Sequence, residues 1–323
     1  MRKEDLRIVF MGTPEFAVPS LKALIDSGYN VVGVITAPDR QSGRGRKIKM
    51  SAVKEYAISQ DLKVLQPTNL KDREFQSELE ILKPNLQIVV AFRMLPKTVW
   101  ELPEYGTFNL HASLLPQYRG AAPINYAIIN GEKETGLTTF FLDEKIDTGK
   151  ILLQDKIEIS NDDNAGTLHD KLMILGSSLV IKTVEGIVKQ NIEPVPQNEA
   201  DLGSEPKKAY KISKDDCKID WNNDQQTIKN FIRGLSPYPA AFTSMVNNST
   251  AKRINVKIFD VEFSDAKIPQ SSPGTINLVD NSLVVTCRNG FLKIIELQVE
   301  GKKRLKSEDF LRGFVGLDSY SFI

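Results

Sequence analysis

The chain has 323 residues, of which 41% are hydrophobic and 26% charged, which is ordinary for a soluble globular protein and favours two domains. It contains no run of about 18 apolar residues, so no membrane-spanning helix is expected. The N-terminus lacks a signal-peptide core, and we expect a cytoplasmic protein. With two cysteines 70 residues apart and two histidines, neither a metal site nor a disulfide framework is expected.

The net charge of +1 conceals an uneven distribution. Residues 207–323 carry 18 Lys and Arg against 13 Asp and Glu, a net of +5, whereas the preceding residues carry 24 against 28, a net of −4. A basic part beside an acidic part is typical of proteins with a polyanionic partner, but a solvated surface gives the same bias. Both interpretations stay open at this point.

The first 190 residues alternate short apolar runs with helical patterns. The apolar runs are Leu6–Met11, Asn30–Thr36, Lys63–Leu65, Gln87–Ala91 and Thr107–Leu110. Runs that are apolar on both faces and separated by helices predict an α/β fold with a doubly wound, mainly parallel, Rossmann-like sheet. Thr135–Leu142 and Lys150–Ile159 are expected to form a hairpin-like pair at its edge, covered by a helix over Asn164–Gln190.

The turn after the first strand, Gly12-Thr13-Pro14, is not a dinucleotide-binding motif. The GxGxxG pattern is missing, and no acidic residue occupies the ribose-binding position after a second strand. We therefore expect neither NAD nor FAD.

The remaining residues differ in composition and in the pattern of predicted elements. Residues 191–211 are rich in proline and polar side chains without periodicity, which predicts a linker. Beyond it, tight turns join short strands, which predicts a small antiparallel barrel or sandwich over residues 212–323. The expected elements are a helix near Gln226–Leu235 and strands at Val256–Phe263, Thr275–Val279, Leu283–Cys287 and Phe291–Val299.

A polar pair lies at the carboxyl end of the last parallel strand. Strand alternation places Phe108 and Leu110 on one face and Asn109 and His111 on the other. An amide donor beside an imidazole suits a reaction at a carbonyl, because one group can stabilise an oxyanion while the other moves a proton. A buried histidine beside a turn asparagine, both with structural roles only, fits the same residues.

A carboxylate follows in the turn Asp147-Thr148-Gly149. Hydrogen bonds within a turn can aim such a side chain into a cleft, although aspartate is also common in turns for structural reasons. Beside Asn109 and His111, Asp147 would complete an amide, an imidazole and a carboxylate. That trio suits the transfer of an acyl group between two nitrogen atoms without a serine or cysteine nucleophile.

A basic segment, Asp39–Lys49, follows the second strand and contains five basic residues and two glycines in eleven positions. It cannot pack as core, so we expect an exposed, mobile loop that either binds phosphates of a nucleic acid or is simply solvated. His169 lies within a helical pattern and is expected to be a structural helix residue.

With these motifs the chain resembles the bacterial methionyl-tRNA formyltransferases, within the folate-dependent formyltransferase superfamily, over nearly its whole length. The matching set Asn-x-His, Ser-Leu-Leu-Pro and Asp-Thr-Gly is typical of the superfamily, and the basic loop and the size of the C-terminal domain are typical of the tRNA enzymes. The matching segments are Phe10–Phe16, Asp39–Lys47, Asn109–Pro116, Tyr118–Ile124, Asp147–Gly149 and Ile219–Trp221.

The resemblance implies a role for each matching segment. The catalytic trio is Asn109, His111 and Asp147, in a catalytic domain over residues 1–190. The tetrahydrofolate-binding residues are Ser113, Leu114, Leu115 and Pro116, and the tRNA-binding residues are Arg40, Arg44, Arg46 and Lys47. The C-terminal domain, 212–323, is expected to be a tRNA-binding OB-like β-barrel.

The reaction implied by the resemblance transfers the formyl group of 10-formyltetrahydrofolate to the α-amino group of methionine on initiator methionyl-tRNA, for translation initiation. No metal and no protein partner are implied, and a monomer is expected. Alternatives are another folate-dependent formyltransferase or hydrolase acting on a small amine, and a catalytically inactive RNA-binding relative.

Two segments depart from the family pattern. Phe92–Pro96 is one residue shorter than usual and lacks a glycine, which puts details of the folate contact in doubt. Pro239-Ala240-Ala241 replaces the more usual Pro-Gly-Ala in the C-terminal domain.

Overall fold

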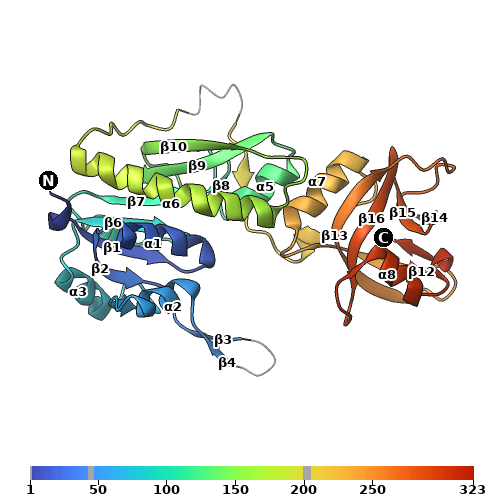
Figure 1. Cartoon of the computed structure of the whole chain (residues 1–323), viewed down its shortest axis with the longest axis horizontal. Helices are drawn as coiled ribbons and strands as arrows, with labels where there is room; N and C mark the ends of the chain where they lie inside the picture. The colour runs from blue at the N-terminus through green and yellow to red at the C-terminus, as the bar shows by residue number, and fades with distance from the viewer. Residues whose placement is uncertain (1, 43–46, 199–204) are drawn as a thin grey trace. The chain divides into compact units, whose positions relative to one another are not determined.

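A computed structural model describes residues 2–42, 47–198 and 205–323 of the chain (Figure 1). These residues form two compact units whose segments interleave along the sequence. Unit 1 comprises Met1–Gly120, Glu134–Ile157 and His169–Lys208. Unit 2 comprises Ala121–Lys133, Glu158–Leu168 and Ala209–Ile323.

Unit 1 is built on a seven-stranded sheet with the order β10-β9-β7-β6-β1-β2-β5. Neighbours from β7 to β5 are parallel, whereas β7 and β9 are antiparallel. The strands are β1 (Arg7–Gly12), β2 (Asn30–Ile35), β5 (Val64–Leu65), β6 (Leu86–Val90), β7 (Thr107–His111), β9 (Glu134–Phe141) and β10 (Ile151–Glu158). The predicted mainly parallel α/β sheet is confirmed.

Helices cover both faces of this sheet. On one face, Phe75 and Leu79 of α3 pack in a buried cluster with Val89 of β6. On the other face α6 runs along the sheet, where a Cβ on Gly176 would lie 2.8 Å from Leu110 Cδ2 (Figure 1). The helices are α1 (Val18–Asp26), α2 (Ala52–Ser59), α3 (Arg73–Ile81), α4 (Lys97–Trp100) and α6 (Ala165–Lys189), with 3₁₀ turns η1 (Lys3–Asp5) and η2 (Glu15–Ala17).

Two small two-stranded sheets lie outside the seven-stranded sheet. Strands β3 (Arg40–Ser42) and β4 (Lys47–Lys49) form an antiparallel hairpin, and β8 (Arg119–Gly120) pairs with β11 (Lys208–Ala209). The second pair falls partly in the segment expected to be a linker. In that segment Val195 also bridges Ile151, so more of it is paired than its irregular composition indicates.

Unit 2 contains a strongly curved antiparallel sheet with the order β14-β15-β16-β13-β12-β18, and β17 pairs with β16. A bridge between Thr275 and Ser321 joins its two edges, so the sheet is nearly closed. The predicted antiparallel barrel is confirmed. The elements are α5 (Pro123–Ile129), η4 (Asp215–Cys217), α7 (Gln225–Leu235), β12 (Ala241–Asn247), β13 (Arg253–Ser264), β14 (Ile276–Val279), β15 (Ser282–Cys287), β16 (Gly290–Val299), β17 (Leu305–Lys306), α8 (Ser307–Gly313), η5 (Leu317–Ser319) and β18 (Tyr320–Phe322).

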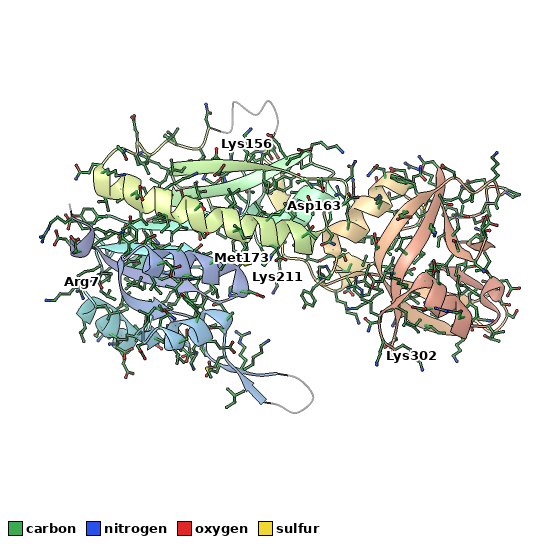
Figure 2. The ribbon with its side chains drawn as sticks, viewed as in Figure 1. Arg7, Lys156, Asp163, Met173, Lys211 and Lys302 are labelled. Carbon is green, nitrogen blue, oxygen red and sulfur yellow. The ribbon has the colours of Figure 1, made fainter. Side chains whose placement is uncertain are left out.

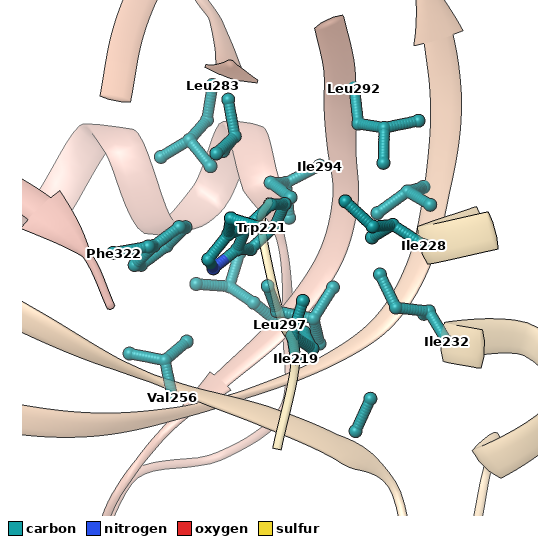
Figure 3. Close-up of a cluster of buried hydrophobic side chains, with 14 of the residues drawn as sticks. Ile219, Trp221, Ile228, Ile232, Val256, Leu283, Leu292, Ile294, Leu297 and Phe322 are labelled. Atoms are coloured by element: carbon teal, nitrogen blue, oxygen red, sulfur yellow. The ribbon is translucent and has the colours of Figure 1, made fainter. Parts of the chain in front are cut away.

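Trp221 lies in the core of this barrel (Figure 3). Its ring stacks on Phe322, with centroids 5.5 Å apart and planes 13° apart, and its Nε1–H donates to Thr243 Oγ1 at 3.0 Å. The indole nitrogen is therefore satisfied inside an apolar cluster, as a buried tryptophan requires. Because Phe322 belongs to β18, this short strand is part of the core.

Candidate active site

Parallel pairing brings the polar ends of the strands to one edge of the unit 1 sheet. Asn109 of β7 is in register with Val89 of β6, and β6 is in turn in register with β1. Leu110 lies on the opposite face, against α6, so Asn109 and His111 share a face as the alternation predicts. Ligand sites of parallel α/β sheets lie at this carboxyl edge.

The His111 ring is buried, with 6% of the residue exposed. Its Nε2 lies 2.9 Å from the backbone carbonyl oxygen of Tyr118. A carbonyl oxygen only accepts, so Nε2 carries a proton and donates it. The other ring nitrogen, Nδ1, lies 3.8 Å from Asp147 Oδ2. That distance is too long for a hydrogen bond but allows attraction between a protonated ring and a carboxylate.

The turn that carries Asp147 is held from two sides. Asp147 Oδ2 accepts the Gly120 N–H at 3.0 Å, and the backbone of Asp147 has a φ of +55°, in the left-handed region. The Thr148 hydroxyl donates to the Asp143 carboxylate, whose two oxygens lie 2.8 and 2.9 Å from Thr148 Oγ1. At Gly149 a Cβ would lie 1.7 Å from the Phe141 carbonyl oxygen, so only glycine fits there.

Gln197, which no sequence motif indicated, also holds this turn. Its Nε2 donates to the carbonyl oxygens of Asp147 and Gly149, both at 2.9 Å. Its Oε1 accepts from the Arg119 guanidinium, at 3.1 Å from Nε and 2.6 Å from a terminal nitrogen. One amide thus ties the segment after α6 to the aspartate turn and to β8.

The Asn109 side chain is half-buried and has no hydrogen-bond partner among the residues that the structure describes. Its amide is thus available to a ligand at the edge shared with His111. The structure brings His111 and Asp147 together and places Asn109 on the same strand and face as His111.

The segment Ser113–Pro116 is fixed mainly by its own contacts. Ser113 Oγ donates to the Gln117 carbonyl at 2.6 Å, and Thr138 Oγ1 donates to the Ser113 carbonyl at 2.7 Å. Thr138 Oγ1 also accepts the Leu115 N–H at 3.0 Å. Ser113, Leu115 and Pro116 are buried and only Leu114 is half-exposed, so most of these side chains shape the loop.

Two exposed apolar side chains, here called the apolar rim, lie in the aspartate turn and in the segment before α4. Ile146 is 62% exposed and Met94, in the shortened segment Phe92–Pro96, is 74% exposed. An ion pair of 3.0 Å between Lys97 Nζ and Glu144 Oε1 links the helix after the shortened segment to this turn. Exposed apolar side chains beside polar reactive groups are typical of a ligand site.

The basic loop is described only at its stem. Arg40 is exposed at the start of β3, and the backbone of Lys47 lies in β4. Arg44, Arg46 and the side chain of Lys47 lie outside the described residues. The stem is anchored at Asp39, which pairs with Lys54 at 2.6 Å and accepts from Gln66 Nε2 at 2.9 Å.

His169 lies in α6, apart from the trio. Its ring contacts Phe16 at a centroid distance of 5.2 Å, and its Nδ1 lies 2.9 Å from Asp170 Oδ1. Among the described residues no group of three or more His, Cys, Asp or Glu is arranged to hold a metal. None of the described helices is long and apolar enough to cross a membrane.

Comparison with known proteins places this geometry in a family. Residues 6–184 match the formyl transferase family, and residues 211–315 match the formyl transferase C-terminal domain family. A methionyl-tRNA formyltransferase of Bacteroides fragilis is 54% identical over 97% of this chain and 97% of its own.

Solved structures share the fold at low sequence identity. A sugar 3N-formyl transferase, WlaRD, superposes with a TM-score of 0.63 at 21% identity, covering 92% of this chain and 99% of its own. An N-formyltransferase of Helicobacter canadensis gives a TM-score of 0.61 at 22% identity, over 93% and 100%. The two-part architecture is therefore that of formyltransferases.

Proposed function

The chain belongs to the methionyl-tRNA formyltransferase family and is a formyl-transferring enzyme, and we propose that Asn109, His111 and Asp147 perform the transfer. The family uses folate derivatives. In this proposal the donor is 10-formyltetrahydrofolate and the acceptor is the α-amino group of methionine on initiator methionyl-tRNA.

The observation that carries the assignment is the pairing of the His111 ring with the Asp147 carboxylate at the edge where the Asn109 amide is free of protein partners. The acceptor amine attacks the formyl carbon, a C–N bond forms and the carbonyl oxygen becomes an oxyanion. The bond to the folate nitrogen then breaks. One proton must leave the amine, and one must reach the folate nitrogen.

The ring of His111 supports the oxyanion and the proton movement. With Nε2–H donated to Tyr118, a charged ring has its remaining N–H on Nδ1, which no hydrogen bond to Asp147 engages at 3.8 Å. That N–H can stabilise the oxyanion together with the Asn109 amide, and it can protonate the leaving nitrogen. Asp147 keeps the positive ring in place and takes the proton of the incoming amine.

Folate is assigned to the Ser113–Pro116 segment and the apolar rim. Leu114 is the half-exposed side chain of that segment, so we expect the other three to act by fixing the backbone that meets the ligand. Met94 and Ile146 offer exposed apolar surface suited to a flat pterin ring.

The tRNA is assigned to Arg40, Arg44, Arg46 and Lys47 and to the basic C-terminal part. A net charge of +5 over residues 207–323 suits binding to a phosphate backbone. This positive charge would contribute little to the binding of a small neutral amine.

A substrate comparison tests the proposal. Purified protein with 10-formyltetrahydrofolate is expected to formylate initiator methionyl-tRNA, and N-acetylmethionyl-tRNA, which lacks a free amine, is the matched control. Methionine amide and an amino sugar are offered in parallel. Formylation of the small amines alone would assign the chain to another formyltransferase, and tRNA binding without any product would indicate an inactive RNA-binding protein.

A further inference from the structure

Two arginines flank one short segment at the carboxyl edge of the unit 1 sheet. The Arg93 guanidinium, just after β6, donates to the carbonyl oxygen of Thr68 at 2.8 Å and to that of Pro67. The preceding residue, Gln66, donates to Asp39 Oδ1 at 2.9 Å, and Arg40 follows Asp39 in the chain. Hydrogen bonds through residues 66–68 thus connect the two arginine-bearing segments.

The positive charges of this pair are not balanced within the described residues. The Arg93 guanidinium is held by neutral carbonyl groups, and the Arg40 guanidinium has no hydrogen-bond or ion-pair partner among the described residues. The nearby carboxylate of Asp39 is already paired with Lys54 at 2.6 Å. Burial first, and then the charge of Arg40, lower the pKa of the Arg93 guanidinium, as expected for a cation without a counter-ion.

The pair lies on the same edge as the proposed reaction site. Arg93 follows β6, which is the direct neighbour of the strand that carries Asn109 and His111, and Arg40 follows β2 on the other side of β1. All these strands are parallel, so the segments that follow them leave the sheet at its carboxyl edge.

The side chain of Arg93 is preorganised for binding a ligand. A guanidinium has five N–H groups in a rigid fork, and the carbonyls of Pro67 and Thr68 use two of them. These contacts fix the fork before any ligand arrives, so less side-chain freedom is lost on binding. The remaining donors match the oxygen atoms of a carboxylate or phosphate.

We propose that Arg40 and Arg93 form an oxyanion-binding pair that holds a negatively charged part of one substrate beside the reaction site. The inference rests on the proposed function, which supplies two sources for the oxyanion. One is the glutamyl tail of the folate donor, with its carboxylates, and the other is a phosphate near the acceptor end of the tRNA.

The chain offers a closely matched control for the test. Arg7, at the start of β1, is also an arginine whose guanidinium is held by backbone carbonyls, those of Leu82 and Lys83. It lies at the opposite end of the sheet, away from the β3–β4 hairpin (Figure 2). Arg93→Gln and Arg7→Gln therefore remove the same charge and the same kind of contact at the two ends of the sheet.

The experiment measures KM for each substrate in the wild type, Arg93→Gln, Arg40→Gln and Arg7→Gln. If the pair binds the glutamyl tail, Arg93→Gln and Arg40→Gln each raise KM for 10-formyltetrahydrofolate about tenfold, the usual size of a lost charged hydrogen bond. KM for 10-formyltetrahydropteroate, which lacks the glutamate, then stays unchanged. If the pair binds a tRNA phosphate, KM for methionyl-tRNA rises instead and the salt slope falls by about one.

Unchanged KM for both substrates in Arg93→Gln and Arg40→Gln, or equal changes in Arg7→Gln, would overturn the inference. Arg40 is exposed, so Arg40→Gln decides the question if loss of the Arg93 contacts disturbs folding. A wild-type chain that forms no formylmethionyl-tRNA would instead contradict the proposed function, so the two failures are distinguishable.

Discussion

The orientation of the His111 ring is the residue-level feature on which the proposed chemistry depends. The Tyr118 carbonyl engages Nε2, which leaves Nδ1 toward Asp147 and toward any ligand at the sheet edge. The backbone of β8 in turn fixes the carboxylate through the Gly120 N–H. Two backbone groups from one short loop therefore set the relative positions of the imidazole and the carboxylate.

The proposed roles predict a large loss of turnover from single substitutions. Asp147→Asn and His111→Ala are each expected to lower kcat by about 10² to 10⁴, the usual range for loss of a proton-transferring group. The affinity for tRNA should change little, because neither side chain is among the residues assigned to tRNA binding. Single-turnover formylation and tRNA binding measured on the same preparations check this, and His169→Ala serves as the histidine control.

A contradictory result would be near-normal turnover in either variant. Equal losses in His169→Ala would also count against the assignment, because that residue lies in α6 and contacts Phe16 and Asp170.

Among the elements, the β3–β4 hairpin depends on a half-buried polar cluster at its stem, formed by Asp39, Lys54 and Gln66. Hydrogen bonds from Lys54 first, and then from Gln66, lower the pKa of the Asp39 carboxyl below its usual 3.8. A carboxyl whose pKa is lower in the folded state stabilises the fold above its unfolded pKa, and this stabilisation is lost as the pH falls through the folded value.

The variant Asp39→Asn should therefore have a lower melting temperature than the wild type at pH 7. The difference is expected to stay constant down to about pH 5 and to shrink below pH 3.8. Thermal unfolding followed by circular dichroism at stepwise pH values checks this, with Asp61→Asn, in an exposed turn, as the control. A difference that grows on acidification would contradict the assignment.

Most elements of the fold could be predicted because their residues carry strong periodic signals. β1 and β6 are buried and largely apolar on both faces, and the turns before β15 and β16 carry Asp-Asn and Asn-Gly. In contrast, β12 and β18 went unpredicted. β12 follows a proline-rich stretch and mixes polar with apolar side chains, and β18 has three residues, so neither has a period of its own.

The site could be predicted as residue types but not as an arrangement. Alternation along β7 put Asn109 and His111 on one face, and the turn motif identified Asp147. The support from Gln197 could not be predicted, because a long-range hydrogen bond to a backbone carbonyl leaves no local sequence pattern. The same holds for the contact of Arg93 with the carbonyls of residues 67 and 68.

At the scale of the whole molecule, the barrel of unit 2 depends on the last residues of the chain. Phe322 is 2% exposed, stacks on Trp221 and pairs with Met245 in β12. Ser321 of the same strand forms a β-bridge with Thr275 at the other edge of the sheet.

The variant Phe322→Ala is expected to destabilise unit 2 by about 3 to 5 kcal/mol, the usual cost of truncating a buried phenylalanine. Denaturant unfolding followed by tryptophan fluorescence checks this, because Trp221 lies against the altered side chain. Ile323→Ala is the matched control, since Ile323 is 44% exposed. Equal stability of the two variants would show that the terminal strand contributes little to the barrel.

The position of β18 also has a consequence for how the chain is made. A ribosome makes a chain from its N-terminus, so the last segment of unit 1, which ends at Lys208, is made well before β18. The unit 1 sheet can therefore form during synthesis, whereas the barrel stays open along one edge until β18 has left the ribosome. A chain that still lacks β18 exposes unpaired strand groups that attract other strands, so the pairing of β18 is also the step that protects the barrel from aggregation.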